Sequence, residues 1–310
     1  MRIDVHAHFL PEGYRSVLQR AGHDRPDGMP AIPEWSAAEH VTLMDRLGIE
    51  TSLLSISSPG VALGDGTGAT ELAREVNEEG RRAVVDHPGR FGLLASLPLP
   101  DVDAAVAEIA YCCDHLEVDG FVLLTNVDGT YVGDAANEPV FRELDRRGAR
   151  VLLHPTSPVC WEHTSFDRHR PMLEFFFDTT RAVIDLVLNG TLARCPDLAL
   201  IVPHAGATLP MVADRVGAFA MLLAPDIDVL HELGRLHFDL AGFAVPRQLD
   251  ALLTMTTPDN LHYGSDFPFT PEFLVSAMAE TLDGVESLGS RSYANTLKLF
   301  PALAQRRGMQ

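Results

Sequence analysis

The chain has 310 residues, of which 46% are apolar and 22% are charged, proportions that are ordinary for a globular protein with a large buried core. Its formal net charge of −19 argues against nucleic acid or an anionic membrane as partner, because both require a basic surface. The acidity leaves room for a small anionic substrate, since one arginine or a metal ion can reverse the field inside a pocket.

The first residues contain no long apolar run, so we expect neither a signal peptide nor a membrane anchor. Four cysteines, at positions 112, 113, 160 and 195, show no CxxC spacing. We therefore expect reduced thiols in a cytoplasmic protein, with the adjacent pair Cys112 and Cys113 acting as small apolar residues on a helix.

Short β-branched runs alternate with amphipathic segments along the chain, a pattern typical of βα units around a parallel sheet. The predicted strands are 3–6, 51–57, 92–97, 120–124, 150–154, 199–203, 235–239 and 261–264. The predicted helices are 37–47, 68–87, 101–116, 139–148, 175–195, 207–223, 247–255, 271–282 and a last one near 291–300.

Eight alternations of strand and helix favour a closed TIM (β/α)8 barrel over an open doubly wound sheet. We expect residues 1–310 to form a single barrel domain of the α/β class. Residues 11–35 contain four prolines and little periodicity, and they predict a long loop above the mouth of the barrel.

His6 and His8 end the first predicted strand. Residues i and i+2 of a strand point to the same face, so both imidazoles are expected to project into the barrel mouth. Two neutral imidazoles on a rigid strand form half of a zinc-type site. The alternative is that they are merely two tolerated polar residues at a strand end.

Three further residues of the same chemical type follow other predicted strands. His154 ends the fifth strand, His204 lies just beyond the sixth, and Asp266 lies two residues past the eighth. The carboxyl ends of barrel strands meet at one opening, where barrel enzymes have their active sites. Five such residues at this opening predict a metal-dependent active site.

These residues and their surroundings resemble the amidohydrolase superfamily, and within it the decarboxylase-rich branch typified by aminocarboxymuconate-semialdehyde decarboxylase. The resemblance covers nearly the whole chain. It is carried by HAH at 6–8, RFGLLASLPLPD at 90–101 and GSDFPF at 264–269. The stretches LLHPTSP at 152–158, DTTRA at 178–182 and NGTLARCPDL at 189–198 are similar to 6-methylsalicylate decarboxylase-type members.

The resemblance implies that His6, His8, His154 and Asp266 hold one divalent metal ion, with zinc favoured and manganese as the alternative. His204 would lie just outside these ligands, and the protein would be a homodimer. Two-metal members of the superfamily bridge their metals with a carboxylated lysine on strand four. The single lysine of this chain, Lys298, lies in the last predicted helix, so we expect one metal only.

Several residues are candidates for contact with a substrate. Arg25 in the first loop, and Arg168, Arg170 or Arg181 after the fifth strand, offer a cation to a carboxylate, although solvated charges are the alternative. Phe269 could line a cavity for an aromatic ring, and Asp239 at the end of the seventh strand could orient His204.

The expected reaction is non-oxidative decarboxylation of a small aromatic or unsaturated carboxylic acid, of the 6-methylsalicylate or other hydroxybenzoate type. Asp266 is the first candidate for the proton donor and His204 the second. The same residues would serve a hydrolase acting on a lactone or an amide, with a metal-activated water as nucleophile. A third alternative is a metal-binding barrel without turnover, acting as a regulator or scaffold.

Overall fold

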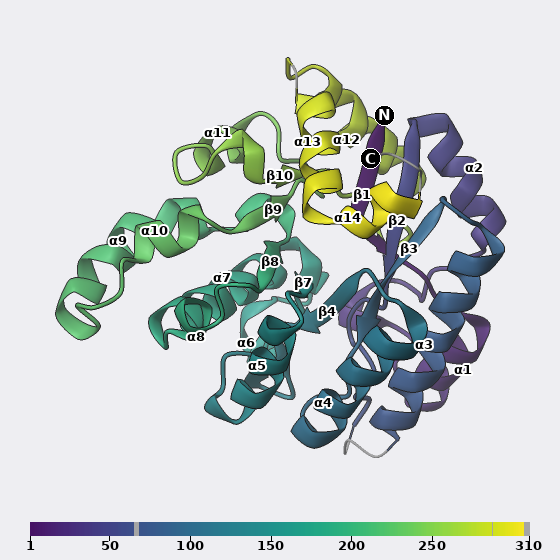
Figure 1. Ribbon diagram of the computed structural model, residues 1–310, viewed down its shortest axis with the longest axis horizontal. Helices are drawn as coiled ribbons and strands as arrows, with labels where there is room; N and C mark the ends of the chain where they lie inside the picture. Colours follow the sequence, from purple (N-terminus) through teal and green to yellow (C-terminus); the bar gives the residue numbers. More distant parts are fainter. Residues whose placement is uncertain (65–67, 287, 307–310) are drawn as a thin grey trace.

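The computed structural model describes residues 1–64, 68–286 and 288–306, and a barrel of parallel strands forms its centre (Figure 1). In barrel order the strands are β1 (Arg2–His8), β2 (Ile49–Ser55), β3 (Phe91–Ser96), β4 (Gly120–Leu124), β7 (Arg150–His154), β8 (Ala199–Val202), β9 (His237–Asp239) and β10 (Leu261–His262). Backbone contacts return from the last strand to the first: the amide of Val5 donates to Tyr263 at 2.9 Å, and that of His8 to Phe267 at 2.7 Å. The sheet thus closes, which confirms the predicted (β/α)8 barrel.

Helices surround the barrel (Figure 1). They are α1 (Glu12–Arg20), α2 (Ala37–Leu47), α3 (Ala69–Asp86), α4 (Val102–Tyr111), α5 (Glu138–Arg146), α6 (Trp161–Thr164), α7 (Glu174–Leu188), α8 (Thr191–Arg194), α9 (Leu209–Leu223), α10 (Val229–Gly234), α11 (Arg247–Leu252), α12 (Glu272–Asp283), α13 (Leu288–Leu299) and α14 (Pro301–Arg306). The short strands β5 (Asn126–Val127) and β6 (Thr130–Tyr131) form a separate hairpin. Of the residues that the structure describes, none belongs to a helix both long and apolar enough to cross a membrane.

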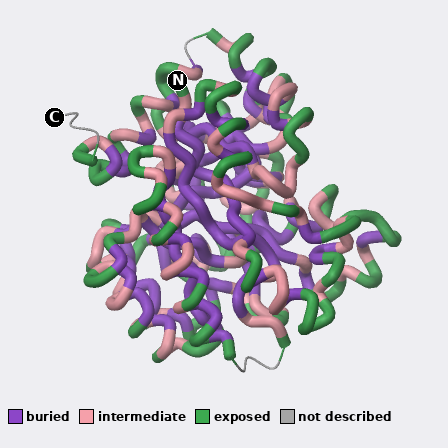
Figure 2. Tube along the Cα trace, turned by 90° about the vertical axis from the view of Figure 1, so that its right-hand side faces the viewer, coloured by how far each residue is buried: buried purple, intermediate pink, exposed green. Residues whose placement is uncertain are grey.

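Two apolar clusters hold these layers together. A smaller cluster fills the barrel itself and contains side chains from several strands, such as Val5, Leu94 and Ile201. Phe300 and Leu303, from the C-terminal part of the chain, belong to the same cluster. The larger one lies between sheet and helices, and Figure 2 shows the buried backbone running through the middle of the molecule. Each fully buried side chain of this kind contributes about 1.5–3 kcal/mol, so the strand ends are carried on a rigid frame.

The structure differs from the predicted elements in the first loop and at the helix ends. Residues 11–35 contain α1, whose buried Tyr14 and Leu18 stand one helical turn apart, so the prediction of a continuous loop was wrong. The predicted helix 175–195 is divided into α7 and α8, because Gly190 adopts a left-handed φ of 74° between them. The predicted helix 101–116 ends in one π-helical turn, Cys112–Leu116, with Cys112 buried in the core.

Candidate active site

The carboxyl ends of β1, β7 and the segment after β10 bring four polar side chains to one point. His6, His8, His154 and Asp266 each offer one ligand atom, and these atoms lie within 4.8 Å of one another. The imidazole ring centres of His6, His8 and His154 are 4.8–5.2 Å apart. All three histidines are buried. Four donors this close, from segments so far apart in sequence, could hold a metal ion.

Contacts on the outer ring nitrogens fix the direction of each imidazole. His6 Nδ1 lies 2.8 Å from Asp239 Oδ2, and His154 Nδ1 donates to the carbonyl oxygen of Pro155 at 2.7 Å. His8 Nδ1 lies 3.0 Å from Ser55 Oγ. Each Nε2 is thereby turned toward the common centre. Histidines that bind metals are oriented in this way by a second hydrogen bond.

One buried atom of the cluster is suited to binding a metal ion. His6 Nε2 is buried and has no hydrogen-bond partner among the described residues, although Asp266 Oδ1 lies 3.5 Å away. A buried polar atom without a partner costs about 1–3 kcal/mol. A divalent cation at the centre of the four side chains would satisfy this nitrogen, so the residues present fit a single metal ion.

Asp266 is held by a backbone that few residues adopt. Its φ is 58°, and its amide donates to the carbonyl oxygen of His6 at 2.7 Å, which ties the segment after β10 to β1. One carboxylate oxygen lies 3.1 Å from His8 Nε2, and the other accepts a hydrogen bond from Thr270 Oγ1 at 3.1 Å. The carboxylate therefore faces both the imidazoles and the open mouth.

His204 stands beside these four residues without joining them. Its Nε2 lies 3.9 Å from Asp266 Oδ2, which is too long for a hydrogen bond. The ring of Phe176 on α7 stacks on the imidazole of His204, with centres 5.7 Å apart and planes 25° apart. The structure thus places His204 next to Asp266, at the rim of the four clustered side chains.

Burial and neighbouring charges set the protonation of the cluster. Burial alone would raise the pKa of Asp266, but the imidazoles of His204, His8 and His6 outweigh it and hold that pKa well below its ordinary range. Burial, together with the charges of His8 and His6, lowers the pKa of His154 well below its ordinary value. Asp266 is therefore ionised and His154 neutral at pH 7, the forms in which a carboxylate and an imidazole bind metals.

Asp239 serves two groups at once. Its Oδ2 contacts His6 Nδ1, while its Oδ1 accepts hydrogen bonds from the backbone amides of His204 and Ala241, each at 3.0 Å. The carboxylate therefore touches the backbone of His204 and not its imidazole. The sequence connected Asp239 with His204 alone and gave no sign of its contact with His6, which depends on closure of the barrel, because only β10 then separates β9 from β1.

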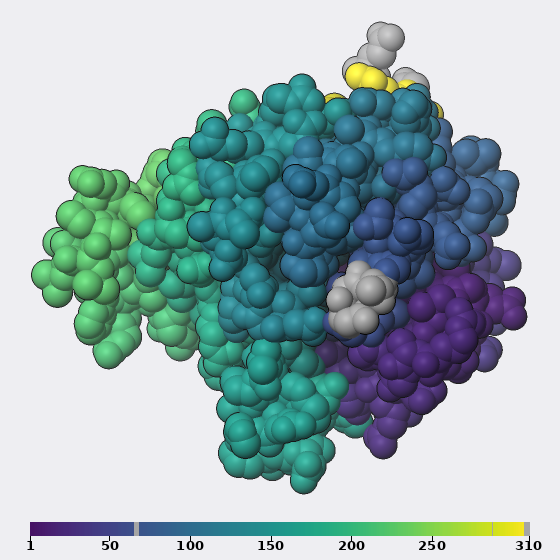
Figure 3. All heavy atoms as spheres, turned by 90° about the horizontal axis from the view of Figure 1, so that it is seen from below, coloured from purple at the N-terminus to yellow at the C-terminus, as the bar shows by residue number. Residues whose placement is uncertain are grey.

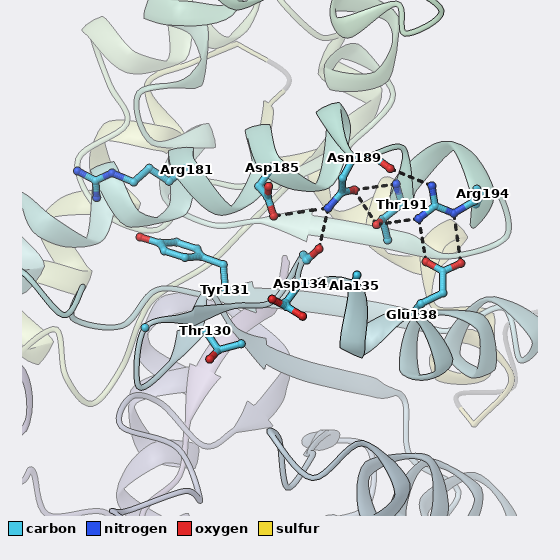
Figure 4. Close-up of a pocket in the computed structure, with 12 residues that line it drawn as sticks. Thr130, Tyr131, Asp134, Ala135, Glu138, Arg181, Asp185, Asn189, Thr191 and Arg194 are labelled. Carbon is cyan, nitrogen blue, oxygen red and sulfur yellow. Dashed lines mark hydrogen bonds and ion pairs between the residues drawn. The ribbon is translucent and has the colours of Figure 1, made fainter. Parts of the chain in front are cut away.

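The candidate substrate residues lie in different places. The centre of the Phe269 ring is 5.7 Å from that of His8, so Phe269 lies beside the four clustered side chains. Arg25 is exposed, and its Nε donates to Met29 at 3.4 Å within its own loop. Arg181 is half-exposed on α7 and lines an outer groove of about 900 Å³ beside the β5–β6 hairpin (Figure 4). The structure brings neither arginine to the four clustered side chains.

Arg170 lies closer to the barrel mouth. It lines a cavity of about 410 Å³ that Thr156 and Ser157, just after β7, also line. Its Nε donates to Ser157 Oγ at 2.6 Å, its guanidinium lies 4.1 Å from the centre of the Trp161 ring, and Ser157 in turn donates to Asp27 in the first loop. The two long loops over the mouth are joined through these contacts.

Comparisons with known proteins agree with this geometry. A family model described as Amidohydrolase matches residues 3–304. The chain is 35% identical to the 6-methylsalicylic acid decarboxylase of Penicillium expansum, over 97% of both chains. A crystal structure described as amidohydrolase II superposes with a TM-score of 0.92 at 34% identity, covering 97% of this chain and all of that one.

A more distant structure has the same fold. It is a dihydroxybenzoic acid decarboxylase from Polaromonas sp. JS666 with bound manganese and the inhibitor 2-nitroresorcinol, and it superposes with a TM-score of 0.81 at 22% identity over 97% of each chain. The resemblance that the motifs indicated is confirmed. This chain belongs to the amidohydrolase family.

Proposed function

We propose that the protein is a metal-dependent carboxy-lyase that removes carbon dioxide from a small aromatic acid of the hydroxybenzoate type. The observation that carries the proposal is the cluster of His6, His8, His154 and Asp266 with His204 beside it. The sequence similarity of this protein to a 6-methylsalicylic acid decarboxylase extends over 97% of both chains, so it includes the loops as well as the barrel.

The four clustered side chains would hold the ion, and a bound divalent metal would act as a Lewis acid toward the substrate carboxylate and an adjacent hydroxyl. Zinc suits three imidazole nitrogens and one carboxylate oxygen, and we propose it as the metal, with manganese as the alternative. The two charged partners of His6, Asp239 and Asp266, balance the charge of a divalent cation in this buried place.

Decarboxylation breaks the bond between the ring carbon and the carboxyl carbon. The electron pair of that bond stays with the ring, and the same ring carbon must gain one proton. Asp266 Oδ2 and His204 Nε2 lie 3.9 Å apart, so one group can deliver this proton while the other holds or replaces it. Phe269 and Phe176 present aromatic surface beside His8 and His204, where a planar ring would stack.

The test is a carbon dioxide assay on metal-loaded protein with 6-methylsalicylate, other hydroxybenzoates and aminocarboxymuconate semialdehyde. We expect release from at least one of these acids, and loss of that release in Asp266→Asn. The absence of release from every acid, with about one metal bound per chain, would favour the hydrolase alternative and call for a panel of lactones and amides.

We further propose that the protein forms a homodimer through α9. Figures 1 and 3 show α9 and α10 projecting from the side of the barrel. On one side of α9, Met211, Phe219 and Leu222 are 76%, 53% and 81% exposed. Exposed apolar surface of this extent marks a contact site, and a second copy of the same chain is its simplest occupant.

We also propose a cytoplasmic location. Cys112, Cys113, Cys160 and Cys195 are all free thiols in the structure, as is usual where the compartment is reducing.

A further inference from the structure

The segment that carries His204 has an unusual backbone. His204, Ala205 and Ala207 have φ values of 54°, 51° and 53°, although none of them is glycine. Positive φ values of this kind cost about 1–3 kcal/mol for each residue with a β-carbon. Such a segment keeps its shape only where surrounding groups hold it, and strain of this kind is found at functional sites.

The imidazole of His204 contacts the rings of Phe176 and His6, whose centres lie 5.7 Å and 5.2 Å from its own. Its Nδ1 is buried without a hydrogen-bond partner among the described residues, and its Nε2 is 3.9 Å from Asp266. Stacking on Phe176 limits the tilt of the ring but not its distance from Asp266. The position of the ring is therefore set by the backbone of residue 204 together with these two ring contacts.

That backbone is held from two sides. On one side, Asp239 Oδ1 accepts the amide hydrogen of His204 at 3.0 Å. On the other, Gln248 at the start of α11 donates through Nε2 to the carbonyl oxygens of His204 at 2.5 Å and of Ala207 at 3.2 Å. The two carbonyls are three residues apart and lie at the two ends of the turn. The side-chain amide of Gln248 therefore links both ends of this turn.

We infer that Gln248 is a positioning residue of the active site, which acts through the backbone of His204. It would hold the imidazole at the distance from Asp266 at which both groups reach the substrate. The effect of Gln248 on catalysis rests on the proposed function. Its hydrogen bonds to the turn at residues 204–207 are a property of the fold and do not depend on that function. Nothing in the sequence separates Gln248 from an ordinary helix residue, because its two acceptors lie more than 40 positions away.

Two substitutions of similar length separate hydrogen bonding from packing. Gln248→Met keeps the size of the side chain and removes both donated hydrogens, whereas Gln248→Lys keeps a donor at the end of the chain. Arg247→Met changes an exposed neighbour on the same helix and is the matched control. We expect Gln248→Met to lower kcat by about ten- to one-hundredfold with the metal content unchanged, because small misplacements of catalytic groups have effects of this size. Gln248→Lys should recover part of the loss.

A double-mutant cycle distinguishes positioning from a general structural role. If Gln248 acts through His204, then Gln248→Met should have little further effect on kcat in a His204→Ala background. An equal fold-loss in both backgrounds would overturn the inference, as would equal activity of Gln248→Met and Gln248→Lys.

Amide hydrogen exchange gives a readout that needs no activity. We expect faster exchange of residues 204–208 in Gln248→Met, with the exchange of β8 unchanged, and the parent rate in Arg247→Met. Unchanged exchange at 204–208 would overturn the inference even if the enzyme were active. Faster exchange in a protein without decarboxylase activity would leave Gln248 as the residue that holds the turn and reject the proposed reaction instead.

Discussion

His154 ends β7 and His204 follows the neighbouring strand β8, but their ring nitrogens contact different groups. His154 Nδ1 donates to a backbone carbonyl, which turns Nε2 toward His6, His8 and Asp266. His204 has a buried Nδ1 without a partner among the described residues and lies at the rim of the cluster. At the scale of single residues, we therefore expect two separate roles: one imidazole that holds the metal and one that acts on the substrate.

Two alanine substitutions test this separation. His154→Ala should lose bound metal and activity together, because three of four donors form a much weaker site. His204→Ala should keep about one metal per chain and lose activity by about 10²-fold or more, the usual contribution of a general acid or base. Metal analysis of the purified proteins checks both, with the exposed His163→Ala as control. Loss of metal from His204→Ala would contradict its placement outside the metal ligands.

Buried polar contacts also join neighbouring elements of the barrel, and those of His262 on β10 are a clear example. His262 Nδ1 lies 2.9 Å from Thr296 Oγ1 on α13, and its Nε2 lies 3.0 Å from His237 Nδ1 on β9. Burial lowers the pKa of His262 to about 3, and the nearby charge of His237 acts in the same direction. The folded protein therefore keeps this imidazole neutral.

This neutral histidine makes folding sensitive to acid. In the unfolded chain a histidine has a pKa of about 6.5, so below that pH the unfolded chain binds a proton that the folded chain does not. Stability is thus lost as the pH falls from 6.5 toward 3. We expect His262→Asn to reduce the loss of unfolding free energy between pH 7 and pH 5 by about 2 kcal/mol.

Urea unfolding at the two pH values, in the presence of a chelator, measures this difference without a contribution from metal loss. The exposed His115→Asn serves as control and should retain the pH dependence of the parent. Equal pH dependence in His262→Asn and the parent would show that His262 binds a proton as readily in the folded protein as in the unfolded chain, and would contradict this account.

At the scale of elements, the barrel was predictable because each strand is a short apolar run followed by a polar or small residue. That the side chains of His6, His8, His154 and Asp266 meet was predictable for the same reason, because these residues lie at or just after strand ends. Asp239 and Gln248 illustrate the limit. Their partners, His6 and the carbonyls of His204 and Ala207, are distant in sequence, and only closure of the barrel brings them together.

Other misses also have physical reasons. The helix α1 is short, and its apolar residues Tyr14 and Leu18 are too few to show a period beside the prolines that follow. Arg181 lies in the connection after β7 and is charged, as a residue that binds a substrate carboxylate should be. Its position on α7 turns it to the outer groove in Figure 4, and a helical face cannot be assigned from the sequence without knowing the crossing of that helix on the sheet.

At the scale of the whole molecule, the projecting α9 carries a group of exposed apolar side chains. Leu222 is 81% exposed near its end, with Phe219 one turn before it. A stable pair of subunits buries about 800 Å² on each partner, largely in apolar side chains of this kind. We expect the isolated protein to be a dimer and α9 to lie in its interface.

Leu222→Glu tests this surface, because it would bury a charge between the two copies. We expect light scattering after size-exclusion chromatography to give the dimer mass for the parent and the monomer mass for the variant at micromolar concentration. Val85→Glu places the same charge on an exposed apolar residue of α3, on the other side of the barrel, and should remain dimeric. A dimer in Leu222→Glu, or dissociation of both variants, would contradict the assignment of the interface.

We propose that the five residues at the barrel mouth remove a carboxyl group and deliver a proton in its place. The most direct measurement is turnover of 6-methylsalicylate by metal-loaded protein in heavy water, followed by mass spectrometry and NMR of the product. We predict one carbon dioxide per product molecule and one deuterium at the ring carbon that carried the carboxylate, with neither in Asp266→Asn. Substrate recovered unchanged, by a protein that holds its metal and hydrolyses a lactone or an amide, would contradict the decarboxylase and establish the hydrolase in its place.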